Sequence, residues 1–214
     1  MSLAPDRIAV YLASLDGQLR LDPWARRRVL TEVEDHLREA EGSGGDDRPE
    51  SFFGDHKGLA RELTLAWLER RYSGLKFFLI VAAVVTALAM FAIRTLLGGA
   101  PLSGGPSQAD AFVQVFNRGA GLVALLLVGA AFIVARARPF DVARVGWFTR
   151  LAGTAAGLLG ASVVGEGATI ALRLPFIDPA QLLPVAAFLL AETIVVSTTL
   201  GMWGLAHRIV AGLR

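Results

Sequence analysis

The chain contains no cysteine and only two lysines, against 19 arginines, among its 214 residues. The absence of cysteine excludes disulfide bonds, thiolate catalysis and cysteine-ligated zinc. Charge is also scarce in one part of the chain, because residues 74–214 carry only five acids and ten bases. Residues 1–73 carry 14 acids and 11 bases, so a net charge of −3 precedes a net charge of +5. This asymmetry divides the chain into a soluble part and an apolar part.

Several sequence signals of function are missing. The first 21 residues have no apolar run, so we expect no cleavable signal peptide. The chain has no Gly-rich phosphate loop, His-Glu-x-x-His pair, Ser-centred elbow or intramembrane protease dyad. Glu32 and His36 lie four residues apart, but further ligands for a metal are hard to nominate. We therefore predict no enzyme, and no catalytic, cofactor-binding or metal-binding residues.

Four long apolar segments follow residue 74, at about 75–97, 119–135, 151–172 and 182–206. Crossing a bilayer core of ~30 Å takes about 20 mostly apolar residues in a helix. A mean hydropathy of +0.52 with 54% hydrophobic residues is typical of an integral membrane protein. We predict an all-α chain, in which a small cytoplasmic three-helix module (1–73) precedes a four-helix transmembrane bundle (74–214).

The arginines predict how the bundle is oriented in the lipid bilayer. Four of them, Arg136, Arg138, Arg144 and Arg150, lie between the second and third apolar segments. The first and third connections are nearly neutral. The positive-inside rule then places the arginine-rich connection and both termini in the cytoplasm. Because orientation explains the basic residues, we predict no direct nucleic-acid partner. The excess of arginine, alanine and glycine indicates a bacterial gene, and hence a multi-pass protein of the bacterial inner membrane.

Helical periodicity predicts the elements of the soluble module. A first helix opens at Pro5-Asp6, with apolar residues at Ile8, Leu12, Leu15 and Leu19. Asp22-Pro23 is a helix-start signal for a second helix reaching Glu41. We assign one apolar side to this second helix, consisting of Trp24, Val29, Leu30, Val33 and Leu37. A third helix opens near Asp55, and only Gly74 interrupts its apolar pattern before Leu97, so it can continue into the first span as a rod.

Residues 5–68 resemble a known family. The residues that carry the resemblance are Tyr11-Leu12, Leu15, Leu19, Pro23, Arg26, Leu30, Glu32, His36-Leu37, Glu39, Phe53-Gly54, Leu59-Ala60 and Glu62-Leu63. This order is similar to the HAAS-type signalling domain, also described as a permease prefix domain. The segment Gly42–Pro49 is longer and more acidic than is usual for that family. The resemblance implies a small cytoplasmic helical module in front of membrane spans, associated with PadR-like transcription regulators or transporter components, without catalytic residues.

The second helix of the module is the candidate partner-binding element. Its candidate residues are Trp24, Arg26, Leu30, Glu32, His36 and Leu37. The mixed charge around them is also typical of an ordinary solvated helix face. We expect this module to bind a cytoplasmic or membrane protein.

Two acids lie inside the apolar segments, Glu166 in the third and Glu192 in the fourth. An ionised carboxylate near the bilayer centre costs at least ~2.5–3.5 kcal/mol on insertion scales, so such groups are normally paired, neutral or beside a polar cavity. Arg173 lies two turns beyond Glu166 on the same helix face, and Ser162 shares that face. These four polar residues form either a proton or cation relay, a contact with a partner subunit, or an interhelical hydrogen bond that only fixes packing.

Small residues recur every four positions in the third apolar segment, at Gly153, Gly157, Ala161 and Gly165. Such a stripe lets another helix approach closely. The pattern does not identify the partner, which is a helix of the same chain or one of a second subunit in a homo- or hetero-oligomer.

These observations favour a bacterial inner-membrane regulatory or scaffolding protein, whose cytoplasmic module binds a transcription regulator or a transporter component. The first alternative is a structural or accessory subunit of a larger membrane complex. A second alternative is a proton-coupled transporter or channel subunit that uses Glu166 and Glu192.

Overall fold

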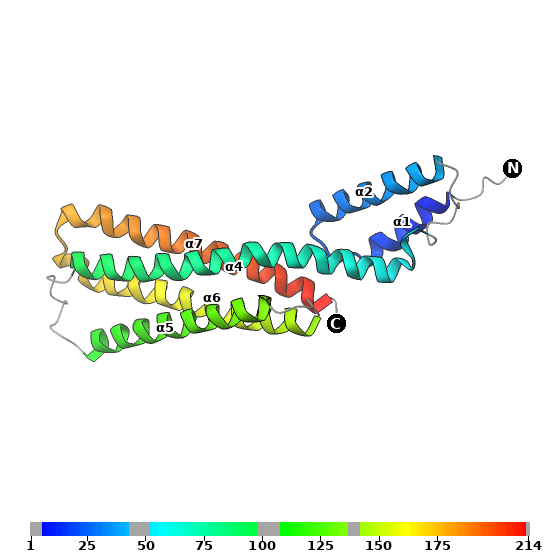
Figure 1. Ribbon diagram of the computed structural model, residues 1–214. Coiled ribbons are helices and arrows are strands. Elements are labelled where there is room, and N and C mark those ends of the chain that lie inside the picture. Colours follow the sequence, from blue (N-terminus) through cyan, green and yellow to red (C-terminus); the bar gives the residue numbers. More distant parts are fainter. Residues whose placement is uncertain (1–5, 43–51, 98–107, 137–141, 213–214) are drawn as a thin grey trace. The chain divides into compact units, whose positions relative to one another are not determined.

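The computed structural model describes residues 6–42, 52–97, 108–136 and 142–212 (Figure 1). Its helices are α1 (Arg7–Gln18), α2 (Pro23–Gly42), α4 (His56–Leu97), α5 (Gln108–Arg136), α6 (Val142–Arg173) and α7 (Pro179–Gly212), with a 3-10 turn η1 (Leu174–Phe176). No strand occurs in these ranges, which confirms the predicted all-α class.

Among the described residues, the four helices α4 to α7 are each long and apolar enough to cross a membrane, which indicates a multi-pass membrane protein. Their outer surfaces carry large apolar side chains. On α4 these side chains form one stripe of Phe77, Ile80, Val84, Leu88 and Phe91. The spacing of three and four residues places them on one helix face. An apolar face exposed in this way suits lipid rather than water.

The chain forms two compact units, one of Tyr72–His207 and one of Met1–Arg71 with Arg208–Arg214. Helix α4 contributes to both units because it runs without a break from His56 to Leu97. The third helix predicted for the soluble module is therefore the first part of α4, and the described residues show no separate three-helix module. Gly74 lies inside this helix, where a Cβ atom would make only an ordinary contact with Met202. The segment Gly42–Pro49 lies almost wholly outside the described residues.

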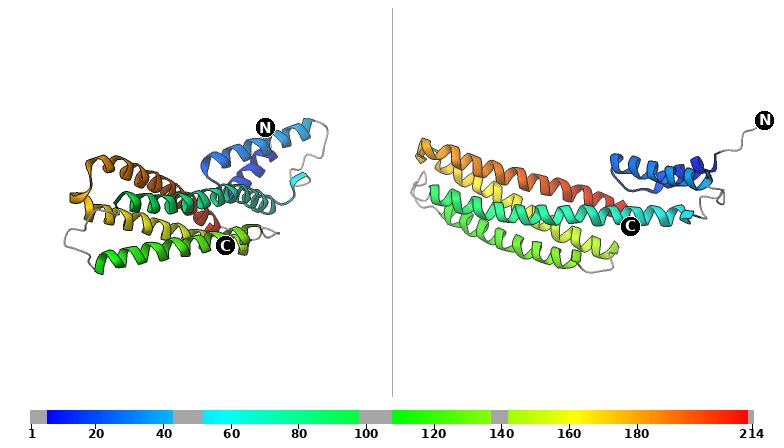
Figure 2. Two further views of the ribbon diagram at one scale, coloured as in Figure 1. Left: turned by 60° about the vertical axis from the view of Figure 1, so that its left-hand side comes forward. Right: turned by 45° about the horizontal axis from the view of Figure 1, so that its top comes forward.

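In the larger unit, α4 to α7 lie side by side (Figures 1 and 2). One buried residue from each helix meets in a shared cluster, consisting of Ala82, Ala124, Leu159 and Val196. Thr149 of α6 contacts both α4 and α7 through polar groups. Its hydroxyl lies 2.7 Å from the Tyr72 hydroxyl of α4, and its carbonyl accepts a 2.8 Å hydrogen bond from Trp203 Nε1 of α7. Hydrogen bonds between helices thus add to the apolar packing of the shared cluster.

In the smaller unit, aspartates begin both N-terminal helices. Asp6 Oδ1 accepts hydrogen bonds from the backbone N–H groups of Ile8 and Ala9, at 3.0 and 3.5 Å. Asp22 Oδ1 accepts one from Ala25 at 2.9 Å. Both side chains therefore satisfy donors that a helix leaves unpaired at its start, as the sequence predicts.

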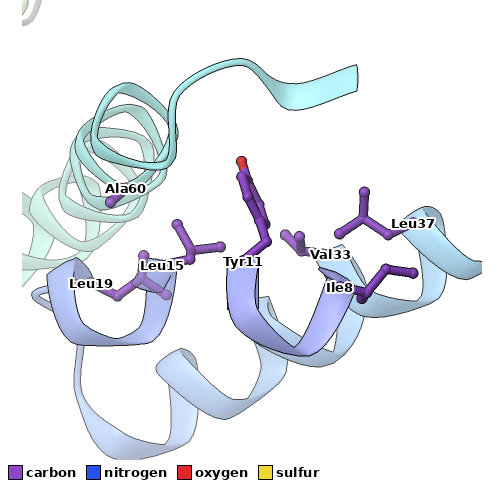
Figure 3. Packing of buried hydrophobic residues seen from close by; sticks show 7 residues of the cluster. All are labelled: Ile8, Tyr11, Leu15, Leu19, Val33, Leu37 and Ala60. Atoms are coloured by element: carbon purple, nitrogen blue, oxygen red, sulfur yellow. The ribbon is translucent and has the colours of Figure 1, made fainter. Parts of the chain in front are cut away.

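The core of this unit lies between α1 and α2 and includes the beginning of α4 (Figure 3). Its buried residues are Ile8, Tyr11, Leu15, Leu19, Val33, Leu37 and Ala60. The placement of Trp24 on the apolar side of α2 is wrong, because its side chain is 72% exposed. Trp24 and Val33 are nine residues apart, and nine steps of about 100° place them half a turn apart around the helix.

Candidate functional site

The two acids of the spans are both buried in the larger unit. Glu166 on α6 is 2% exposed and Glu192 on α7 is 0% exposed. They lie within electrostatic range of each other. Glu166 is hydrogen-bonded to a different helix, because Oε1 accepts a 2.9 Å bond from Asn117 Nδ2 of α5. The two carboxyl groups therefore share one polar region but have different surroundings.

Asn117 reaches Glu166 because Gly165 has no side chain. A Cβ atom at Gly165 would lie 2.3 Å from Asn117 Oδ1, which is too close for any side chain without rearrangement. Asn117 is 1% exposed, and its Oδ1 atom has no hydrogen-bond partner in the described parts of the chain. The glycine thus admits a buried amide between α5 and α6.

A cavity of ≈ 230 Å³ lies beside this amide, at the end of the unit where α4 and α6 finish and α5 begins. We call it the arginine cavity. The residues that line it are Ile93, Arg94, Leu97, Gln114, Asn117, Arg118, Glu166, Thr169 and Arg173. The described lining thus includes one arginine from each of α4, α5 and α6 and a single acid, Glu166.

Arg173 has a defined role at this end of the unit. Its Nη1 donates a 2.9 Å hydrogen bond to the Leu97 carbonyl, one of the carbonyls that α4 leaves unpaired at its C-terminus. Arg173 and Arg94 are also within electrostatic range of Glu166. Ser162, on the same helix, is fully buried and its hydroxyl lies 3.6 Å from Met90 Sδ.

Glu192 has no direct hydrogen-bond partner among the residues that the structure describes, although both carboxyl oxygens are buried. The Thr86 hydroxyl of α4 lies near enough to this carboxyl group for a weak interaction, but among the described residues neither group makes a hydrogen bond of regular distance and angle. The other threonines of the described helices bond to the carbonyl four residues earlier. Thr86 does not, so its hydroxyl remains available to a group other than its own helix.

The small-residue stripe of α6 contacts two helices of the same chain. A Cβ atom at Gly153 would lie 2.3 Å from Trp203 Nε1 of α7, whereas Gly165 faces Asn117 of α5. Gly157 has open space around it, and Ala161 is half-buried. Residues four apart advance by about 400° around a helix, so a four-residue repeat drifts by about 40° per step. Twelve residues therefore turn the stripe by about 120°, from one neighbouring helix to another.

The candidate partner-binding residues of α2 separate into buried and accessible positions. Leu37 is buried and Leu30 is partly buried, so both belong to the core of the unit. Arg26 joins α2 to α1 through a bidentate ion pair with Asp16. The hydrogen bonds to Asp16 raise the pKa of Arg26 above its ordinary value. These residues hold the unit together.

Trp24, Glu32 and His36 are the exposed residues of the predicted set, whereas Arg26 is half-buried in its ion pair with Asp16. Arg28 completes the row at four-residue spacing, and its guanidinium lies 5.8 Å from the centre of the Trp24 ring. We call Trp24, Arg28, Glu32 and His36 the α2 row. Among the described side chains, no group of three or more His, Asp or Glu is placed to hold a metal ion.

Comparison with protein-family models, with curated proteins and with solved structures gave no match. The similarity of residues 5–68 to the HAAS-type domain therefore stays a prediction.

Sequence reasoning did not identify several residues of the polar region, namely Thr86, Arg94, Asn117 and Arg118. Arg94 was available as a charge three residues before the end of the first apolar segment. Asn117 and Arg118 directly precede the second segment, and the position of α5 shows that they lie within a helix. For Arg94, Asn117 and Arg118, the available signal was a polar residue within one turn of the end of an apolar segment.

Proposed function

We propose that this chain is a regulatory or scaffolding protein of the bacterial inner membrane, in which the helical unit built from α1 and α2 binds a cytoplasmic protein. The exposed indole of Trp24 is the observation that carries the proposal. Tryptophan and arginine are enriched among the residues that dominate binding energy at protein interfaces. The α2 row presents both types next to each other, on a helix whose opposite side is held in a closed core.

The partner classes follow from the family resemblance, which implies a transcription regulator or a transporter component. The row also supplies one acid and one histidine, so it offers a mixed-charge surface around an aromatic anchor. Such a surface suits a polar protein face with one pocket for the indole.

Replacing Trp24 with alanine is expected to weaken capture of this partner by about tenfold or more, as truncation of a central aromatic anchor does. The measurement is co-purification of the full-length protein from native membranes, followed by quantitative mass spectrometry. Val10→Ala is the matched control, because Val10 is an exposed apolar residue of the same unit that lies outside the α2 row.

Equal capture by the Trp24 and Val10 variants would contradict a role of the row. A soluble transcription factor among the partners that depend on Trp24 would support the regulatory function. Recovery of a stoichiometric membrane assembly that is independent of Trp24 would instead support the accessory-subunit alternative.

The orientation of the spans is part of the proposal, and cysteine labelling tests it. Ala143 and Ala180 are exposed residues near the starts of α6 and α7. In this cysteine-free chain, Ala180→Cys should react with a membrane-impermeant thiol reagent in spheroplasts. Ala143→Cys should react only after permeabilisation, because the arginine-rich side is expected to face the cytoplasm. The opposite pattern would invert the topology and place the α2 row outside the cell.

A proton-coupled function is the second candidate, and the fully buried Glu192 favours it. Ionisable residues inside membrane spans commonly mark proton or ion pathways. Reconstitution into liposomes with a pH-sensitive dye would detect such a function as proton movement that Glu192→Gln abolishes. Equal proton movement by the variant and the wild type would exclude it.

A further inference from the structure

The arginine cavity and a second cavity beside it have complementary chemistry. The second cavity, of ≈ 200 Å³, shares Asn117 and Arg118 with the first. Its other lining is apolar apart from Thr86, and it includes Ala87, Met90, Leu122 and Leu125 from α4 and α5. We call it the apolar groove. A polar, positively charged space therefore adjoins an apolar space of similar size, and Arg118 lies at their common edge.

The charges of the arginine cavity are not balanced by the residues that line it. Its described lining contains three arginines, Arg94, Arg118 and Arg173, and one acid, Glu166, which interacts electrostatically with Arg94 and Arg173. Among the side chains that the structure describes, which do not include those of residues 108–111, Arg94 and Arg118 have no hydrogen bond or ion pair within 4 Å, and Arg118 is exposed. Like charges brought together near a membrane raise the free energy unless an opposite charge joins them. The arrangement thus favours an anion.

We propose that the arginine cavity binds the phosphate group of an anionic phospholipid, with an acyl chain of the same lipid lying in the apolar groove. Guanidinium groups match the geometry of phosphate oxygens and bind them in pairs of parallel hydrogen bonds. Pockets for drug-sized molecules have volumes of about 300–1,000 Å³, so a cavity of ≈ 230 Å³ suits a headgroup. The adjoining groove distinguishes a lipid from a free phosphate ion, which has no apolar part.

Native mass spectrometry of the full-length protein with added phosphatidylglycerol tests the proposal. The wild type is expected to retain one lipid in preference to phosphatidylcholine with the same acyl chains. Arg118→Gln is expected to weaken this binding by about tenfold or more, because a charged hydrogen bond is lost. Arg94→Gln is expected to act in the same direction. Arg173 is less suitable as a test because it also holds the Leu97 carbonyl.

Arg150→Gln is the matched control, since Arg150 is an exposed arginine at the opposite end of the unit, where its guanidinium lies 5.5 Å from the Trp147 ring. It removes the same charge and is expected to leave lipid retention within about twofold of the wild type. An equal loss with Arg118→Gln and Arg150→Gln would mean that the lipid is attracted by net charge alone, and would overturn the proposal. Equal retention of phosphatidylcholine and phosphatidylglycerol would overturn it too.

A second variant separates a lipid from a free anion. Ala87→Trp fills the groove without changing charge, and it is expected to abolish lipid retention. Inorganic phosphate alone is not expected to raise the thermal midpoint of the wild type or to displace the lipid. If millimolar phosphate stabilised the wild type and the Ala87 variant equally, the cavity would be a site for a free anion, and the lipid assignment would be wrong.

Discussion

Replacing Glu192 with methionine is expected to stabilise the protein by about 1–3 kcal/mol, although it removes a fully buried polar residue. Both carboxyl oxygens of Glu192 are buried without a hydrogen-bond partner in the part of the chain that the structure describes. A buried polar group without a partner costs about 1–3 kcal/mol, and methionine fills a similar volume without that cost. With no carboxyl group beside it, the Thr86 hydroxyl is expected to turn and bond to the backbone of its own helix, as the other threonines of the described helices do.

Glu166→Met is the matched comparison and should change stability in the opposite direction. This variant leaves the Asn117 amide without the carboxyl group that it now binds at 2.9 Å. A loss of about 1–3 kcal/mol is expected from the unpaired donor. Unfolding in mixed detergent micelles, followed by tryptophan fluorescence, measures both variants under the same conditions.

The pair of variants also distinguishes a structural acid from a functional one. A stabilised Glu192→Met protein that loses partner-dependent or transport activity would show that the carboxyl group is kept at a cost in stability. A destabilised Glu192→Met protein would contradict the prediction, and would indicate that the carboxyl group makes a hydrogen bond that holds α7 in place.

Gly153→Ala is expected to destabilise the bundle by about 1–3 kcal/mol, which is typical of overpacking in a closely packed interior. The added methyl group would lie 2.3 Å from Trp203 Nε1 and 2.4 Å from its Cε2 atom, both in a rigid ring. The ring would have to move, and the 2.8 Å hydrogen bond from Trp203 to the Thr149 carbonyl would be lost with it. Thermal unfolding of the detergent-solubilised protein measures the effect.

Gly157→Ala is the control within the same stripe. Apart from the neighbouring backbone of α6 itself, no described atom lies within 4 Å of a Cβ atom at Gly157, and alanine favours a helix over glycine by about 1 kcal/mol. This variant should therefore be neutral or slightly stabilised. If both variants destabilised the protein equally, the stripe would contact another subunit at Gly157, and the intrachain packing around Gly153 would not explain the effect.

The helices could be predicted from the sequence because each is specified locally. Apolar runs long enough to cross a bilayer identify α4 to α7, and Asp6 and Asp22 mark helix starts through contacts within a few residues. Glu166 and Glu192 could be identified as candidate site residues because they are the acids inside the four apolar segments. In each case a short stretch of sequence contains the physical cause.

The partners of these residues could not be predicted, because they depend on which helices approach each other. The bond between Asn117 and Glu166 joins residues 49 positions apart and requires a glycine at position 165 to admit the amide. Hydropathy placed Asn117 outside a span, although α5 extends beyond its apolar run. Trp24 was misplaced for another reason, since an apolar residue in the first turn of a helix need not share the buried side of later turns.

The central position of α6 has a consequence for how the protein is made. Tyr72 of α4, Asn117 of α5 and Trp203 of α7 all find their hydrogen-bond partners on α6. During synthesis α4 and α5 leave the ribosome before α6. Asn117 therefore reaches the membrane before Glu166, which accepts its hydrogen bond, has been synthesised. An unpaired amide is costly in hydrocarbon. We therefore expect α5 to remain beside the insertion machinery until α6 arrives, so that the second and third spans enter the lipid together.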